Sequence, residues 1–435
     1  MHEIWEKYGD RFVIELLDSE RKYFALDEIN GNTDITRFYS KTHGWQKRTT
    51  VFWRGDVIVK TVYEQIGIQD NGSIGCITYE ESDTELKTDN RESVLPLTSR
   101  GKPKKLTATN ILSPTPTGCT FYFCINNVSA DPKAEIYAYS KKNSLALPIG
   151  EKERLAEIKT CDDLRGFIEY YVSSCPEDYF EKVGRMRNSA HQTVKYRVGD
   201  IFRMEVDRFR YCYGIITGGV NSIKKWDELP EHHSLRGLMS VPIMVRYYNL
   251  ITDDADMNAE KLSRIPLDRL LICADNDIIW GTHTIVDHKK LTEDDLEFNL
   301  VCTKIWSRNN HNTVFTQNFL VKIGMISLPG EYSLHVEWGT AAITVPYEKI
   351  SAELREYMKD YDSPHSGNML GIPADLLLSK ETSYSYKNNL LEERNRDMRN
   401  ALFSCIGLPE DASFDDFAVK FGGLTKAEIL KKLND

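Results

Sequence analysis

The sequence predicts an α+β protein, with a strand-rich amino-terminal domain, a β-rich central domain that is barrel-like or a twisted sheet, and a helical carboxy-terminal tail. Three observations predict this class. Short β-branched and aromatic runs, separated by glycine and asparagine, dominate the first and central sections. Apolar stripes at helical spacing gather after residue 346. Hydrophobic residues make up 41% of the 435 residues, which is enough to build real cores.

Residues 1–150 are expected to form the strand-rich amino-terminal domain. The stretch from Thr50 to Tyr63 predicts two strands joined at residues 54–56, where Gly55 supplies the turn. The polar stretch from Glu80 to Lys105 predicts a long loop or a linker. Further strands are expected at residues 119–124, 135–139 and 145–147.

Residues 151–190 are expected to form a helical connector. Thr160 and Asp163 have the spacing of a helix start signal, and apolar residues follow on one face. Pro176 favours the first position of a second, shorter helix. We therefore expect two helices between the amino-terminal and central domains.

Residues 191–345 are expected to form the β-rich central domain, because helical patterning is scarce there. Strands are predicted at 200–206, 211–216, 241–250, 270–273, 282–286, 319–323 and 334–338. In the tail, 346–435, Pro346 opens one predicted helix and a second stops at Gly407. Thr425 and Glu428 form a capping box for a third. We expect these helices to pack on the protein's own sheet.

Charge and cysteine usage narrow the functional classes. The chain has 55 basic and 65 acidic residues, a net charge of -10 that argues against a general nucleic-acid binder. The polar amino terminus and the lack of an eighteen-residue apolar run predict neither a signal peptide nor a membrane span. The nine cysteines are scattered, and Cys119 and Cys124 have no second pair nearby. We expect small buried thiols without disulfides or zinc, in a cytoplasmic protein.

Two short stretches are similar to each other. Gly9-Asp10 and Gly199-Asp200 each precede a predicted strand, and an aromatic run follows both within about ten residues. One interpretation is an internal repeat. The other is a common turn-to-strand entry, because Gly-Asp is a frequent turn sequence.

The central section carries a family resemblance. Gly199-Asp200-Ile-Phe202 begins a strand, and Tyr211-Cys-Tyr-Gly-Ile-Ile216 follows. The later part runs from Ile278-Ile-Trp-Gly281 to Asp294-Asp-Leu-Glu-Phe298, with Asp287 where the family often has glycine. Over about residues 194–300 this pattern resembles the immunity protein 26 family. The resemblance implies a bacterial immunity protein of a polymorphic toxin system, which binds and neutralises a cognate toxin without catalysis or a cofactor.

The expected partner is a basic protein toxin, because many toxin domains act on nucleic acid. An acidic inhibitor gains association rate from electrostatic steering toward a basic partner. Two acidic runs are the candidate contact surfaces, and a solvated loop is the alternative interpretation of each. Their residues are Asp253, Asp254 and Asp256 in the first run, and Glu293, Asp294, Asp295 and Glu297 in the second.

No catalytic or metal-binding motif is found in the sequence. Residues from Asp254 resemble a calcium loop, but Ala259 and Ile265 occupy the positions that need glycine and glutamate. His283 and His288 would lie on opposite faces of a strand, and His232-His233 are expected to be exposed to solvent.

Two alternative functions stay open. The first is a phage-defence or nucleic-acid sensing protein. It would combine a basic loop with an aromatic strand, and its residues would be Arg100, Lys102, Lys104, Lys105, Phe121, Tyr122 and Phe123. A soluble loop before a core strand is the other interpretation of that segment. The second alternative is a hydrolase whose site residues are distant in sequence.

Overall fold

The computed structural model describes residues 5, 15–29, 31–42, 45–69, 74–95, 100–112, 114–127, 133–149, 151–228, 241–296, 300–306, 311–317, 333–337, 340–345, 352, 393–421 and 423–434. The chain divides into two compact units. Unit 1 comprises Met1–Val194, Glu205–Arg210 and Trp280–Thr282, and unit 2 comprises Lys195–Met204, Tyr211–Ile279 and His283–Asp435. The four-part division expected from the sequence stays a prediction.

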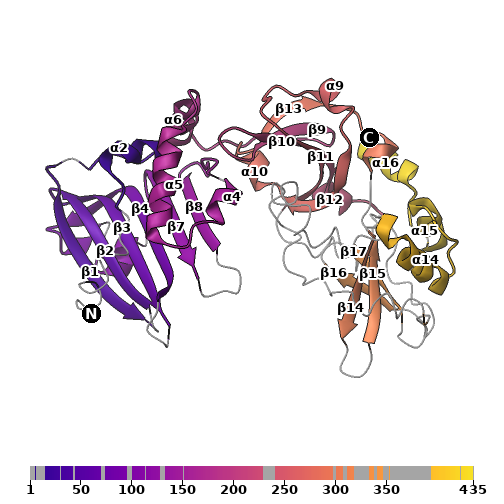
Figure 1. Ribbon diagram of the computed structural model, residues 1–435, viewed down its shortest axis with the longest axis horizontal. Coiled ribbons are helices and arrows are strands. Elements are labelled where there is room, and N and C mark those ends of the chain that lie inside the picture. Colours follow the sequence, from indigo (N-terminus) through magenta and orange to yellow (C-terminus); the bar gives the residue numbers. More distant parts are fainter. Residues whose placement is uncertain are drawn as a thin grey trace. The chain divides into compact units, whose positions relative to one another are not determined.

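Unit 1 is built on an eight-stranded antiparallel sheet (Figure 1). Its path runs β1-β2-β3-β4-β5-β6, and β7 pairs with both β4 and β8. The strands are β1 (Asp34–Thr42), β2 (Trp45–Arg54), β3 (Val57–Ile68), β4 (Ile74–Asp89), β5 (Ser93–Val94), β6 (Lys104–Lys105), β7 (Cys119–Asn126) and β8 (Lys133–Ser140). The turn between β2 and β3 is where the sequence predicts it, and Gly55 there has a left-handed φ of 59°.

The stretch from Glu80 to Lys105 is not one long loop or linker, and that prediction is wrong for residues 80–89. Strand β4 continues to Asp89, and the short strands β5 and β6 follow it. Glu81 and Asp83 lie on the buried face of β4, where basic side chains pair with them. The predicted strand at 145–147 is also wrong, because Ala146 forms only an isolated bridge with Tyr139.

Helices cover one face of this sheet (Figure 1). They are α2 (Asp18–Arg21), η1 (Lys22–Phe24), α4 (Lys152–Leu155), α5 (Cys161–Ser173) and α6 (Tyr179–Asn188). Helix α3 (Ala108–Leu112) instead packs through Ile111 in a separate core with Val51 and Trp53. Thr160 caps α5 as predicted, because its hydroxyl oxygen accepts a hydrogen bond from the Asp163 amide at 3.1 Å. Phe121 of β7 and Ile168 of α5, both buried, belong to one core between the helices and the sheet.

Unit 2 contains a five-stranded sheet in the order β12-β11-β10-β9-β13. These strands are β9 (Asp200–Glu205), β10 (Tyr211–Gly219), β11 (Pro242–Thr252), β12 (Leu267–Ala274) and β13 (Thr284–His288). Three short helices accompany them, α7 (Val220–Ile223), α9 (Ala259–Leu262) and α10 (Asn276–Ile279). The α+β class is confirmed, and within the described residues the sheets are open twisted sheets without a closed barrel.

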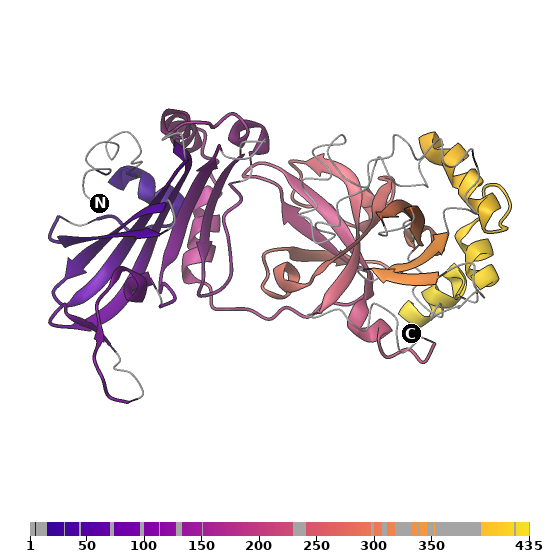
Figure 2. The ribbon, with the colours of Figure 1, turned by 90° about the horizontal axis from the view of Figure 1, so that it is seen from below.

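The rest of unit 2 has a second sheet and the tail helices. The sheet has the order β14-β15-β17-β16, from β14 (Leu300–Trp306), β15 (His311–Gln317), β16 (Ser333–Glu337) and β17 (Thr340–Val345). The helical elements are η4 (Glu393–Asn395), α14 (Arg396–Cys405), α15 (Phe414–Phe421) and α16 (Lys426–Asn434), and Figure 2 shows the tail helices in yellow.

The caps of α14 and α16 form as the sequence predicts, and α16 packs on the protein's own sheet. Thr425 and Glu428 form the capping box of α16, and Gly407 follows α14 with a φ of 70°. Ile429 of α16 is fully buried in the core of unit 2 together with Ile201 and Met244. Among the described residues, no helix is long and apolar enough to span a membrane. The predicted helix from Pro346, the predicted strand at 319–323 and the Gly9-Asp10 stretch lie outside the described residues.

Candidate functional site

The first acidic run follows β11 in unit 2. Asp253 and Asp256 are exposed, and Asp254 is half-buried. The Lys261 ammonium donates to Oδ2 of Asp254 at 2.9 Å, and the Asp256 amide donates to its Oδ1 at 2.8 Å. The hydrogen bond from Lys261 holds the pKa of Asp254 below its usual range. Asp254 therefore fixes the loop, whereas Asp253 and Asp256 present their carboxylates to solvent.

Other contacts tie this loop to the sheet. Asn258 caps α9 by accepting from the Lys261 amide at 3.0 Å. The Asp287 carboxylate of β13 accepts from the Ala259 amide at 2.8 Å. Protein donors thus occupy the side-chain oxygens of Asp254, Asn258 and Asp287, so the loop is shaped by helix capping and an ion pair.

The second acidic run has one buried member. Asp295 is only 3% exposed, accepts from the Thr292 amide at 2.8 Å and pairs with the Lys289 ammonium at 2.6 Å. Glu293 and Asp294 are exposed. Glu297 lies outside the described residues. The carboxylate of Asp295 is therefore used inside the fold, and the described surface of this run is formed by Glu293 and Asp294.

Both acidic runs border the same core of unit 2. Ala255 and Met257, from the first run, pack against a cluster that contains Leu291 and Leu296, which flank the second. The exposed acids therefore sit on loops whose apolar neighbours are anchored in one core. We call Asp253, Asp256, Glu293 and Asp294 the exposed acidic set.

The two histidines near β13 have different surroundings. The His283 ring stacks on Phe202 with centroids 5.7 Å apart, whereas Nδ1 of His288 lies 2.9 Å from Oδ1 of Asp200. In the part of the chain that the structure describes, no three His, Cys, Asp or Glu side chains gather as a metal site. His232 and His233 lie outside the described residues.

The basic loop and aromatic strand of unit 1 do not form one platform. Phe121 and Phe123 are 0% and 1% exposed and belong to the core beneath α5. Arg100, Lys102, Lys104 and Lys105 are exposed. The interpretation of residues 119–124 as a core strand is confirmed, and stacking of bases on the two phenylalanines is excluded by their burial.

A buried ionic cluster in unit 1 was missed by the sequence analysis. It consists of Arg21, Lys60, Glu81 and Asp83, with side chains that are at most 9% exposed. Oε1 of Glu81 lies 2.8 Å from Nε of Arg21 and 2.9 Å from Nζ of Lys60. Nζ of Lys60 also lies 2.5 Å from Oδ1 of Asp83. One ammonium therefore bridges two buried carboxylates.

The pKa values of the two carboxylates in the cluster are shifted in opposite directions. Burial by itself raises the pKa of Glu81, but Lys60 and Arg21 together outweigh it and hold the pKa below its usual range. Burial also raises the pKa of Asp83, and there the single cation Lys60 does not compensate for it. The number of neighbouring cations explains the difference, because Glu81 contacts two and Asp83 contacts one.

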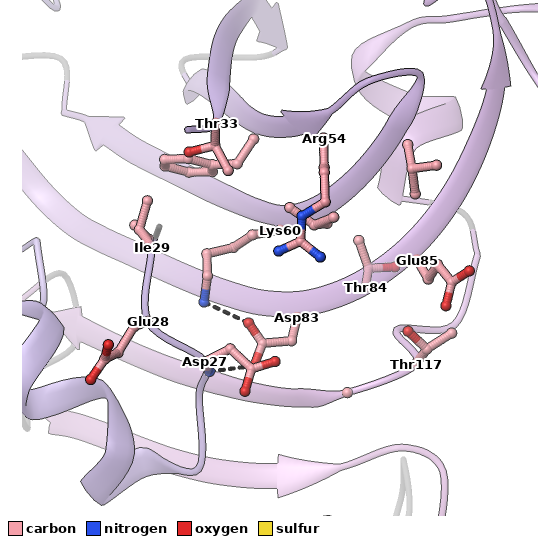
Figure 3. Close-up of a pocket in the computed structure, with 14 residues that line it drawn as sticks. Asp27, Glu28, Ile29, Thr33, Arg54, Lys60, Asp83, Thr84, Glu85 and Thr117 are labelled. Atoms are coloured by element: carbon pink, nitrogen blue, oxygen red, sulfur yellow. Dashed lines mark hydrogen bonds and ion pairs between the residues drawn. The ribbon is translucent and has the colours of Figure 1, made fainter. Parts of the chain in front are cut away.

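Asp83 and Lys60 also line a pocket of about 580 Å³ (Figure 3). Arg54, at the β2–β3 turn, points into it, and Gly118 forms part of its wall. Both oxygens of Asp83 are already hydrogen bonded, Oδ1 to Lys60 and Oδ2 to the Asp27 amide at 2.7 Å. The Asp83 carboxylate is therefore neutralised by an ion pair, whereas Glu28 and Glu85 also line this pocket.

Comparison with known families gives one match. Residues 197–312 match the model of a family described as immunity protein 26. The matched segment covers about a quarter of the chain, begins just before β9 and reaches into β15. It confirms the resemblance predicted from the 199–216 and 278–298 patterns, and it includes both acidic runs. No curated protein and no solved structure matches the chain.

Proposed function

We propose, from the match of residues 197–312 to the immunity protein 26 family, that the chain is a bacterial immunity protein. It binds a cognate toxin of a polymorphic toxin system in the cytoplasm and neutralises it without catalysis. This family match is the observation that carries the proposal. The toxin is a basic protein, and neither nucleic acid nor a membrane is the target.

The geometry of unit 2 supports inhibition by binding. Such inhibition needs a rigid scaffold and a complementary surface, with no reacting groups. The loop of the first acidic run is fixed by Asp254 and Lys261, and that of the second is fixed by the Thr292–Asp295 capping box. Both loops are thus ordered before a partner arrives, which lowers the entropy cost of binding.

The exposed acidic set is the proposed contact with the toxin. Its four carboxylates stand on the matched segment, and the net charge of -10 favours approach of a basic partner. Asp254 and Asp295 hold the two loops in place and do not contact the toxin, because each forms an ion pair with a lysine of this chain. Glu297 continues the second run in sequence and is part of the proposed contact.

The test is a neutralisation assay with the purified toxin encoded beside this chain. We expect the full chain to bind the toxin at a one-to-one ratio and to abolish its activity. The fourfold reversal Asp253→Lys, Asp256→Lys, Glu293→Lys and Asp294→Lys should weaken binding by about tenfold or more, as expected for lost charge complementarity.

A matched control reverses four exposed glutamates that have no side-chain partner among the described residues. They are Glu92, Glu157 and Glu177 in unit 1 and Glu410 in unit 2. This control keeps the same net charge as the fourfold variant, so it should lose association rate but keep the wild-type dissociation rate and weaken binding less. A toxin that stays fully active with excess wild-type chain would overturn the proposal. Equal loss of binding in both variants would exclude the exposed acidic set as the contact.

A further inference from the structure

Two cysteines contact each other on neighbouring strands of unit 1. Cys76 lies on β4 and Cys124 on β7, and their Sγ atoms are 3.6 Å apart. In the antiparallel register Thr78 faces Cys124, and Cys76 faces Asn126. The cysteines are therefore diagonal neighbours two residues apart in register, with both side chains on the same face of the sheet.

The two thiols have different surroundings. Cys124 is half-buried, whereas Cys76 is 7% exposed. The hydrogen bond from Cys76 lowers the pKa of Cys124 and outweighs the opposite effect of burial. The Thr78 hydroxyl, which donates to Sγ of Cys124 at 3.7 Å, adds to this lowering. The same contact with Cys124, followed by burial, raises the pKa of Cys76.

The other described cysteines lack this arrangement. All seven cysteines with described side chains are free thiols, and only Cys76 and Cys124 among them are in sulfur–sulfur contact. Burial raises the pKa of Cys161 to about 11 and that of Cys119 to about 11, so these two are protonated at neutral pH. The contact pair thus combines a reachable nucleophilic sulfur with a second thiol positioned to attack it.

We propose that Cys76 and Cys124 are a reversible disulfide site, which is oxidised by exchange with a small-molecule disulfide of the glutathione class. The Cys124 thiolate attacks one sulfur of that disulfide, which forms a mixed disulfide and releases one thiolate. Sγ of Cys76 then attacks Sγ of Cys124 and displaces the second thiolate, and the two protons of the protein thiols end on the two released small thiols. One small disulfide is reduced to two thiols for each protein disulfide formed.

Closing this bond requires a local movement of the strands. The sulfurs must approach from 3.6 Å to about 2.05 Å, and diagonal pairs are farther apart than the most favourable disulfide positions. The bond is therefore strained and easily reduced, as is typical of regulatory rather than structural disulfides. It would cross-link β4 to β7 at the end of their paired segment, where Cys76 faces Asn126, so oxidation would hold the start of β4 against the end of β7.

The experiment treats the reduced 435-residue chain with oxidised glutathione, followed by acid quenching and alkylation. We expect the intact mass to fall by two hydrogen atoms, and a digest without reductant to contain the peptides of Cys76 and Cys124 joined. Reduced glutathione in excess should reverse the change. The absence of that linked peptide under conditions that oxidise the unfolded chain would overturn the proposal.

Variants separate the roles of the two sulfurs. Cys76→Ser should accumulate a stable glutathione adduct on Cys124, because the resolving thiol is missing. Cys161→Ser, which removes a half-buried thiol outside the pair, should form the disulfide as the wild type does. A C76S chain with no more adduct on Cys124 than on Cys161 would contradict the assignment.

A second measurement does not depend on the folding of any variant. In the wild-type chain at neutral pH, iodoacetamide should alkylate Cys124 at least about tenfold faster than Cys161, because thiolates and not thiols react. Peptide mapping of the alkylated chain measures both rates in one sample. Equal rates would remove the nucleophile on which the exchange depends.

Discussion

Lys60 neutralises two carboxylates that the sheet of unit 1 buries. Its side chain is 4% exposed and lies within 3 Å of both Glu81 and Asp83. A buried ion pair contributes little net stability compared with apolar residues, but removal of one partner leaves an uncompensated charge. A single substitution in this cluster should therefore lower the stability of unit 1 more than a substitution in a surface ion pair would.

We predict that Lys60→Met destabilises unit 1 by about 3–5 kcal/mol, because Asp83 then loses the cation that it contacts and Glu81 keeps only Arg21. The measurement is urea denaturation combined with hydrogen exchange of the β3 and β4 amides. Lys87→Met, at an exposed position of β4 with no side-chain partner among the described residues, is the control and should change stability by less than about 0.5 kcal/mol. Equal stability of K60M and wild type would mean that the cluster is not charged in the folded chain.

Among the secondary-structure elements, helix starts that depend on neighbouring residues are predicted well from the sequence. The capping boxes Thr160–Asp163 and Thr425–Glu428 form as expected, because each depends on residues only three apart. Strand β4 was missed because its burial depends on distant partners. Glu81 can occupy a buried position because Arg21, sixty residues away in sequence, pairs with its carboxylate.

Contacts between residues far apart in sequence also limit the prediction of the sites. The family resemblance could be found from residues 199–216 and 278–298, since it rests on contiguous patterns. The pocket beside Lys60 and the contact of Cys76 with Cys124 could not, because they require the order of the strands. Alternation of Ile77, Tyr79, Glu81 and Asp83 is the signal that would have indicated a strand with a charged buried face.

Neighbouring acids of the second acidic run are predicted to differ in their effect on stability. Asp295→Ala removes the carboxylate that accepts from the Thr292 amide and pairs with Lys289, and we expect a loss of about 1–2 kcal/mol. Asp294→Ala removes an exposed carboxylate and should cost less than about 0.5 kcal/mol. The free energy of unfolding of unit 2 in urea measures both. Similar losses in the two variants would show that the capping box does not hold this segment.

At the scale of the whole molecule, the net charge and the ordered surface loops are expected to control different steps of binding. On the proposed function, the net charge of -10 would guide the approach of a basic toxin without defining where that toxin docks. Docking depends on ordered groups, and the exposed acidic set is ordered by contacts within unit 2. Long-range attraction should therefore affect the association rate, and the local contacts should affect the dissociation rate.

This separation gives a prediction for the association with the toxin. Raising the salt concentration from about 0.05 M to about 0.5 M shortens the screening length severalfold, so the association rate constant should fall by about tenfold or more while the dissociation rate changes little. Stopped-flow mixing of the full chain with the toxin measures both rates. The fourfold reversal of the exposed acidic set should flatten the salt dependence and also speed dissociation. The control reversal of Glu92, Glu157, Glu177 and Glu410 should flatten the salt dependence alone, because it changes the same net charge away from the proposed contact. An association rate that does not respond to salt would mean that a basic toxin surface is not what this chain recognises.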